Sequence, residues 1–141
     1  ALMWAEKAEV LARYLHYGQK DKAGKPYIEH LEFVVEHLDN STDEMRAVAW
    51  LHDSVEDTAI SIDEIQEQLG NVIATAILAI SKRKGEDYQD YLIRVKQNAL
   101  ARSVKLADLQ HNADLSRLPR IKEEDILRKE KYLAAMAFLL S

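Results

Sequence analysis

Two histidines and four carboxylates occur in three short segments of the chain, and their types suit a divalent metal ion. The residues are His30 in PYIEH, His52, Asp53, Glu56 and Asp57 in LHDSVEDT, and Asp108 in VKLADLQHN. Imidazole nitrogens and carboxylate oxygens are common ligands of Zn²⁺, Fe²⁺, Mn²⁺ and Mg²⁺. The sequence contains no Cys, so a thiolate site is excluded.

The segment LHDSVEDT places its acids beside apolar residues. On a helix at about 100° per residue, the His and the three carboxylates share an arc of about 140°. The adjoining arc is apolar and consists of Val48, Leu51 and Val55. A solvated helix face is the alternative interpretation.

Asp108 lies in the middle of an apolar stripe. The other members of the stripe are Leu100, Val104, Ala107, His111 and Leu115. An ionised carboxylate in such a stripe costs several kcal/mol unless it is compensated. We therefore expect a partner for Asp108, either an Arg or Lys from another helix or a bound cation.

His30 lies at the edge of a second apolar stripe, beside Val34. A hydrogen-bonded histidine at the edge of the core is the alternative to a metal ligand here. The three anomalous segments fall on three predicted helices. Together they predict one metal site of two His and two Asp, His30, His52, Asp53 and Asp108, with Glu56 and Asp57 facing the same pocket. A divalent ion would also relieve the repulsion between the carboxylates.

Helices must position these residues, because apolar residues recur at helical spacing between only four Gly and two Pro. We predict an all-α bundle of seven to eight helices forming a single domain over 1–141. The predicted helices span about 3–17, from Pro26 to 38, from Ser41 through LHDSVEDT, from Ser61 to 70, 72–80, 87–97, 99–115 and 123–140. Ser41 with Glu44, and Ser61 with Glu64, have the form of capping boxes.

Composition excludes several classes of protein. A net charge of -5 and a pI near 5.5 argue against a surface for long nucleic acids. The apolar runs fall short of the roughly 18 residues that a membrane span requires. We expect a cytoplasmic protein. The apolar final helix fits either ordinary core or the face of a homodimer.

The three segments in this order resemble the H…HD…D signature of HD-domain metal-dependent phosphohydrolases. GQKDKAGKPYIEH, LHDSVEDT and VKLADLQHN resemble, more narrowly, the RelA/SpoT-like alarmone hydrolases, including their small single-domain members. The resemblance covers about 16–117. It implies an HD-type helical bundle and one metal ion, commonly Mn²⁺, held by the two His and two Asp above. It also implies that Glu56 and Asp57 handle the attacking water, and that Asn112 lines a nucleotide pocket.

The activity implied by the resemblance is 3′-pyrophosphohydrolysis of guanosine 3′,5′-bispyrophosphate (ppGpp). The sequence departs from the family pattern where guanine is usually recognised. Asp21, Lys22, Ala23 and Gly24 replace an Arg-Lys-Ser-Gly-like run, Leu31 replaces a Pro, and Leu115 replaces a polar residue. A phosphohydrolase for another nucleotide, or a metal- and nucleotide-binding module without turnover, is therefore the alternative.

Cations must offset the charge of a phosphate substrate. Lys20, Lys22 and Lys25 in the first loop are candidates, although they also suit a solvated loop. Tyr91 and Arg94 share a helix face and are further candidates for contact with a base or phosphate. For these two residues, packing with a surface ion pair is the alternative.

Overall fold

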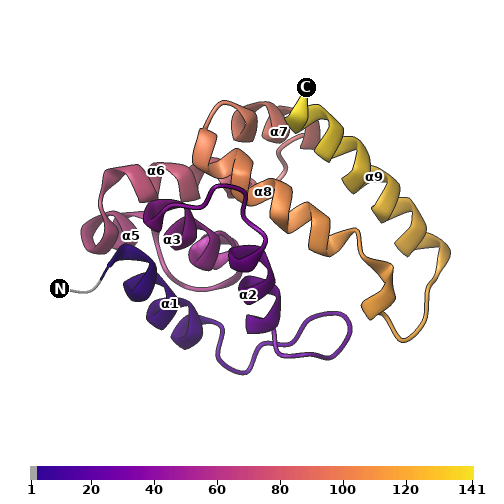
Figure 1. Cartoon of the computed structure of the whole chain (residues 1–141), viewed down its shortest axis with the longest axis horizontal. Helices are drawn as coiled ribbons and strands as arrows, with labels where there is room; N and C mark the ends of the chain where they lie inside the picture. Colours follow the sequence, from indigo (N-terminus) through magenta and orange to yellow (C-terminus); the bar gives the residue numbers. More distant parts are fainter. Residues whose placement is uncertain (1–2) are drawn as a thin grey trace.

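The computed structural model describes residues 3–141 and shows an all-helical chain (Figure 1). Within these residues no β-strand forms, and the one isolated bridge pairs Lys20 with Pro26. The prediction of an all-α bundle is confirmed. The elements are α1 (Trp4–Leu15), α2 (Ile28–Glu36), α3 (Asp43–Leu51), α4 (Ser54–Asp57), α5 (Ile62–Leu69), α6 (Asn71–Ile80), α7 (Tyr88–Lys96), α8 (Ala99–Asn112), the 3₁₀ turn η1 (Leu115–Arg117) and α9 (Glu123–Leu140).

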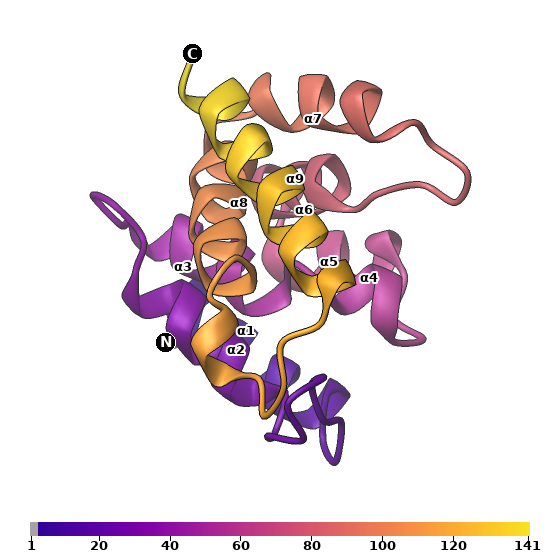
Figure 2. The same cartoon turned by 90° about the vertical axis from the view of Figure 1, so that its right-hand side faces the viewer.

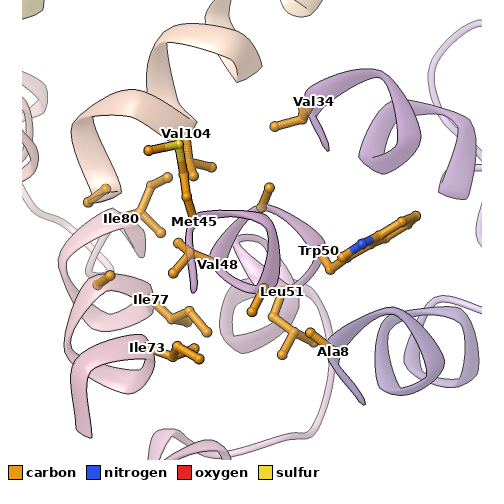
Figure 3. Packing of buried hydrophobic residues seen from close by; sticks show 14 of the residues in the cluster. Ala8, Val34, Met45, Val48, Trp50, Leu51, Ile73, Ile77, Ile80 and Val104 are labelled. Atoms are coloured by element: carbon orange, nitrogen blue, oxygen red, sulfur yellow. The ribbon is translucent and has the colours of Figure 1, made fainter. Parts of the chain in front are cut away.

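Helix α3 lies at the centre of the bundle and contacts α1, α2, α6 and α8. Figure 3 shows Val48 and Leu51 of α3 packed between Ile73 and Ile77 of α6 on one side and Ala8 of α1 on the other. A helix that is apolar on nearly all sides is buried by its neighbours. The segment that carries His52 is therefore anchored in the core.

The predicted third helix is divided in two. It begins after Thr42, whose side chain accepts a hydrogen bond from the Met45 N–H, so Thr42 and not Ser41 is the cap. It ends at Leu51, where Ser54 Oγ donates to the Leu51 carbonyl at 2.6 Å. Side chains that bond to nearby carbonyls in this way compete with the helical ladder. His52 and Asp53 therefore occupy the turn between α3 and α4.

The remaining elements follow the predicted boundaries closely. Ser61 and Glu64 form the expected capping box of α5. Gly70 separates α5 from α6 with φ +88, a conformation that favours glycine. The helix predicted over 99–115 is shorter, because α8 ends at Asn112 and η1 follows.

Two connecting segments lie at one end of the bundle, the loop after α1 and the segment that joins α8 to α9 (Figures 1 and 2). Arg117 Nη1 donates to Asp21 Oδ2 at 3.1 Å and ties the two segments together. They form the rim of the site described below.

None of the helices within residues 3–141 is long and apolar enough to cross a membrane.

Candidate active site

The four predicted metal ligands meet in one place although three separate elements carry them. His30 lies on α2, His52 and Asp53 lie in the turn between α3 and α4, and Asp108 lies on α8. One ligand atom from each lies within 4.8 Å of the other three. Asp108 Oδ1 is 2.9 Å from His30 Nε2 and 3.2 Å from His52 Nε2. Asp53 Oδ2 is 3.2 Å from His52 Nε2 and 3.8 Å from His30 Nε2.

The orientation of His52 is fixed by the end of α3. Its Nδ1 lies 2.7 Å from the Ala49 carbonyl oxygen, which only accepts hydrogen bonds. Nδ1 therefore donates to this carbonyl, and Nε2 faces Asp53 and Asp108. Burial opposes the charged ring, but these two carboxylates raise the pKa of His52 well above its ordinary value. The side chain is 1% exposed, so the ring has no freedom to turn.

His30 is held by a second imidazole. Its Nδ1 lies 2.7 Å from His111 Nδ1, and the two rings stack at 5.0 Å between centroids. His111 also stacks on Phe33 at 4.1 Å. Burial, followed by the positive charge of Arg117, lowers the pKa of His111 to about 4. His111 is therefore neutral at pH 7, and when His30 binds a metal through Nε2 its Nδ1–H would donate to His111 Nδ1.

Asp108 has a protein cation as well as the two imidazoles. Lys105 Nζ donates to Asp108 Oδ2 at 2.9 Å, and Asn112 Nδ2 donates to Oδ1 at 3.2 Å. Burial favours the neutral acid, but the Lys105 charge and the bonds from His30 and His52 hold the pKa of Asp108 well below its usual range. The expected partner thus comes from the same helix, not from another one. The sequence analysis missed Lys105, although its i, i+3 spacing from Asp108 was a signal.

Asp53 is oriented by Tyr27, whose hydroxyl donates a hydrogen bond to Asp53 Oδ2. Burial opposes ionisation, yet the neighbouring His52 lowers the pKa of Asp53 to about 2. Burial and the charge of Asp53 raise the pKa of Tyr27, so its hydroxyl stays protonated. The sequence analysis does not single out Tyr27, because a single sequence does not show where a tyrosine hydroxyl points.

These residues fit a divalent ion. Ligands about 2.0 to 2.2 Å from a metal lie about 3 to 3.5 Å from each other, and three of the four measured separations are 2.9 or 3.2 Å. Two imidazole Nε2 atoms and two aspartate carboxylates that face one another supply the usual donor types. The cluster could therefore hold a divalent metal ion.

Glu56 and Asp57 lie on α4, one turn after the His52–Asp53 pair, and both reach solvent. Glu56 Oε1 accepts the N–H of Lys82 at 2.7 Å. Partial burial and the charge of Asp53 raise the pKa of both carboxyl groups. Each group is thus a better proton acceptor than a free carboxylate. Both feel the charge of Asp53, but neither is among the residues that line the cavity at the ligand cluster, where the sequence analysis placed them.

A cavity of ≈ 380 Å³ opens onto the ligand cluster. His30, Asp53 and Asp108 line its inner wall. The rest is lined by basic side chains (Lys20, Lys22, Lys105, Arg117 and Arg128), by three further aspartates (Asp21, Asp114 and Asp125), and by amide and apolar side chains that include Asn112 and Leu115. The acidic centre therefore faces a volume lined by both charges, whose Lys and Arg side chains offer positive charge to an anionic ligand.

The predicted substrate contacts divide into two groups. Lys20, Lys22 and Asn112 line the cavity. Lys25 lines a neighbouring depression together with Glu29 and Glu32. Tyr91 and Arg94 line neither.

Tyr91 and Arg94 instead hold the end of α6. Tyr91 Oη donates to the Ile80 carbonyl at 2.5 Å, and the side chain is almost fully buried. Arg94 donates to backbone carbonyls of the last turn of α6 and to Glu86. The last carbonyls of a helix have no partner within the helix, so these side chains satisfy a structural need. These contacts agree with the alternative given for Tyr91 and Arg94 in the sequence analysis, in which the two residues pack and form an ion pair.

Comparisons with known proteins agree with this geometry. The HD domain family matches residues 8–111. A GTP pyrophosphokinase of Streptomyces antibioticus is 35% identical over 136 residues, which is 88% of this chain and 16% of that protein. A probable guanosine-3′,5′-bis(diphosphate) 3′-pyrophosphohydrolase of Synechocystis is 33% identical over 143 residues, 92% of this chain and 19% of that protein. The chain thus spans less than a fifth of the length of these relatives.

A solved structure has the same fold. It is that of a metazoan ortholog of SpoT, described as hydrolysing ppGpp, and it superposes with a TM-score of 0.81 at 21% identity. The match covers 99% of this chain and 86% of that one.

Proposed function

Because the chain belongs to the HD domain family, we propose that it is a metal-dependent phosphohydrolase that removes the 3′-pyrophosphate of ppGpp or of a closely similar nucleotide. The observation that carries the proposal is the meeting of His30, His52, Asp53 and Asp108 beside a cavity that Lys and Arg side chains help to line. The relative and the solved structure whose descriptions name ppGpp hydrolysis support this choice of substrate.

His30, His52, Asp53 and Asp108 would hold one divalent ion, for which Mn²⁺ is our first choice and Fe²⁺, Zn²⁺ and Mg²⁺ are alternatives. When bound, such an ion supplies Lewis acidity toward water and a phosphoryl oxygen. Tyr27, Lys105 and His111 keep the ligand atoms in place through the hydrogen bonds described above.

Glu56 and Asp57 would orient the attacking water and take its proton. Their raised pKa values bring them closer to the working pH, which improves proton transfer. Glu56 Oε1 is engaged by the Lys82 N–H, so Oε2 is the oxygen left to accept a proton. General base catalysis of this kind contributes about 10² to 10⁴ in rate.

The phosphates of the substrate need positive charge, and the cavity rim provides it. Lys20, Lys22 and Lys105 lie around the opening, together with Arg117 and Arg128. Lys105 is already neutralised by Asp108 and therefore offsets the charge of the centre itself. The first-loop lysines Lys20 and Lys22 would meet the outer phosphates, whereas Arg117 and Arg128 pair with Asp21 and Asp125.

One observation favours the alternative of a different nucleotide. Both oxygens of Asp21 are occupied within the protein, Oδ1 by the N–H groups of Ala23 and Lys25 and Oδ2 by Arg117. Asp21 therefore has little capacity left to hydrogen-bond a guanine base. Recognition of guanine through Asp21 is thereby weakened, which permits wider nucleotide specificity.

Phosphate and pyrophosphate release from a nucleotide panel tests the proposal. The panel contains ppGpp, GTP, ATP and a 3′-phosphorylated adenosine nucleotide, each with Mn²⁺ and with chelator. We expect Mn²⁺-dependent release of pyrophosphate from ppGpp that is lost in Asp53→Ala. Tight nucleotide binding without turnover would instead indicate a binding module, and turnover of another nucleotide alone would correct the substrate.

A further inference from the structure

The loop between α6 and α7 contacts Glu56 through its backbone. Figure 2 shows this loop on the same side of the molecule as α4. The contact is the hydrogen bond from the Lys82 N–H to Glu56 Oε1, at 2.7 Å. We propose that the Ser81–Lys82 peptide group, held in place by Arg94, orients Glu56 for its role as a base. Arg94 and Lys82 are then positioning residues, and this inference rests on the proposed function.

The peptide group is held on both of its sides. Its carbonyl, that of Ser81, accepts a hydrogen bond from Arg94 Nη2 at 3.0 Å. Its N–H, that of Lys82, donates to Glu56. A peptide unit is planar and, when trans, points its C=O and N–H in opposite directions, and no cis bond occurs within residues 3–141. Arg94 on one side therefore sets the direction of the N–H on the other.

Arg94 is itself immobilised by its remaining contacts. Nη1 donates to the carbonyls of Leu78 and Ala79 at 2.9 and 3.0 Å. Nε and Nη2 donate to the two oxygens of Glu86, at 3.3 and 2.7 Å. A planar guanidinium with several fixed partners is a rigid element, which an ammonium on a flexible stem is not. The end of α6 and the start of α7 are thereby fixed together.

Glu86 completes the loop. Its Oε1 accepts the N–H of Arg83 at 3.0 Å as well as Arg94 Nη2. The two residues on either side of the Lys82 N–H are thus each tied to the Arg94–Glu86 pair, Ser81 by its carbonyl and Arg83 by its N–H. The loop presents a single donor to Glu56 in a fixed direction.

The consequence for Glu56 is a defined carboxylate orientation at an otherwise solvent-exposed position. An exposed glutamate without such a donor would sample several rotamers, and ordering it would cost conformational entropy in each turnover. Polarisation along the chain from Arg94 through the peptide group to the carboxylate strengthens the final bond.

Lys82→Pro removes the N–H together with the lysine side chain, and Lys82→Ala removes the side chain but keeps the N–H. The ratio of their kcat values therefore isolates the effect of the hydrogen bond. Ser81 has φ −86 and ψ 116, the backbone that a residue before proline prefers. We expect kcat of Lys82→Pro to fall about 10- to 100-fold below that of Lys82→Ala, with KM within about twofold. In a Glu56→Gln background the ratio should approach one.

Arg94→Lys serves as a second variant in case the proline disturbs folding. It keeps the positive charge but loses the planar guanidinium that donates to several carbonyls at once, so the Ser81–Lys82 peptide group is held less firmly. We therefore expect kcat to fall while KM and metal affinity stay unchanged. Equal kcat values for Lys82→Pro and Lys82→Ala, or an undiminished ratio in the Glu56→Gln background, would overturn the proposal.

A readout without turnover separates this proposal from the proposed function. The carboxyl pKa of Glu56, followed by ¹³C NMR, should be higher in Lys82→Pro than in Lys82→Ala, because the N–H favours the ionised form. A wild-type protein that lacks hydrolase activity but shows this difference refutes the function and leaves the orientation of Glu56 supported. Unchanged pKa values refute the positioning role itself.

Discussion

Nδ1 of His30 lies 2.7 Å from Nδ1 of His111, so one imidazole holds another whose Nε2 faces the candidate metal site. Ligand histidines generally donate their second N–H to a carboxylate, a carbonyl or water. Here a buried neutral imidazole takes that place, and it is stacked on Phe33. With a metal on Nε2, this contact would keep the proton of His30 on Nδ1 without adding negative charge next to two aspartates.

The His111 contact predicts an effect on metal affinity. His111→Phe keeps the aromatic stack but removes the acceptor, so Mn²⁺ should bind about 10 to 100 times more weakly. Isothermal titration calorimetry measures this directly. His37→Phe is the control, because His37 lies at the exposed end of the same stack. Equal affinities of wild type and His111→Phe would show that His30 needs no such support.

Metal removal should destabilise the protein through Asp108. At free Mn²⁺ about 100 times its Kd, binding adds about 2.7 kcal/mol to the free energy of unfolding. Chelation should therefore lower Tm, and Asp108→Asn should abolish most of that shift. Differential scanning calorimetry checks this, with the exposed α5 variant Glu67→Gln retaining the full shift. If Tm does not change when the metal is removed, and its removal is verified, the proposal of a metal site at Asp108 is contradicted.

Tyr91 should matter for stability and not for substrate binding. Tyr91→Phe leaves the Ile80 carbonyl without its hydroxyl donor, which should lower the free energy of unfolding by about 1 to 3 kcal/mol. Urea denaturation gives the first quantity and steady-state kinetics give KM. A several-fold rise in KM at an unchanged free energy of unfolding would instead indicate that Tyr91 contacts the substrate.

Glu56 should carry a stability cost that depends on pH. Burial, chiefly, raises the pKa of Glu56 above its ordinary 4.5, so the folded state binds this proton more tightly than the unfolded state. Its contribution to stability is therefore largest below pH 4.5 and falls as pH rises through the folded pKa. Glu56→Gln removes this dependence.

Urea unfolding of the metal-free protein between pH 4 and 8 measures the effect. Relative to wild type, Glu56→Gln should gain stability as pH rises above about 5. A difference that stays constant across the range would mean that the carboxyl group of Glu56 is not perturbed in the folded protein.

Much of the fold and of the ligand cluster was predictable because both depend on local patterns. Helical spacing of apolar residues specifies helices wherever Gly and Pro are rare, and nearly all boundaries agree with the structure. His30, His52, Asp53 and Asp108 stood out because each interrupts or borders an apolar stripe, where a polar group needs a partner. The break between α3 and α4 was not predictable from spacing, since the Ser54 hydroxyl competes with the helix at a single carbonyl.

By itself the sequence determined which residues are helical and which polar side chains had to be compensated inside the bundle. Only the tertiary structure decided which donors, acceptors and charges become the partners of these polar side chains. Tyr91 and Arg94 share a helix face that suits a ligand, yet that face packs against the end of α6 and its unpaired carbonyls. Tyr27 contacts Asp53 for the same reason, because a polar side chain bonds to whichever donor or acceptor the packing of other segments brings within about 3 Å.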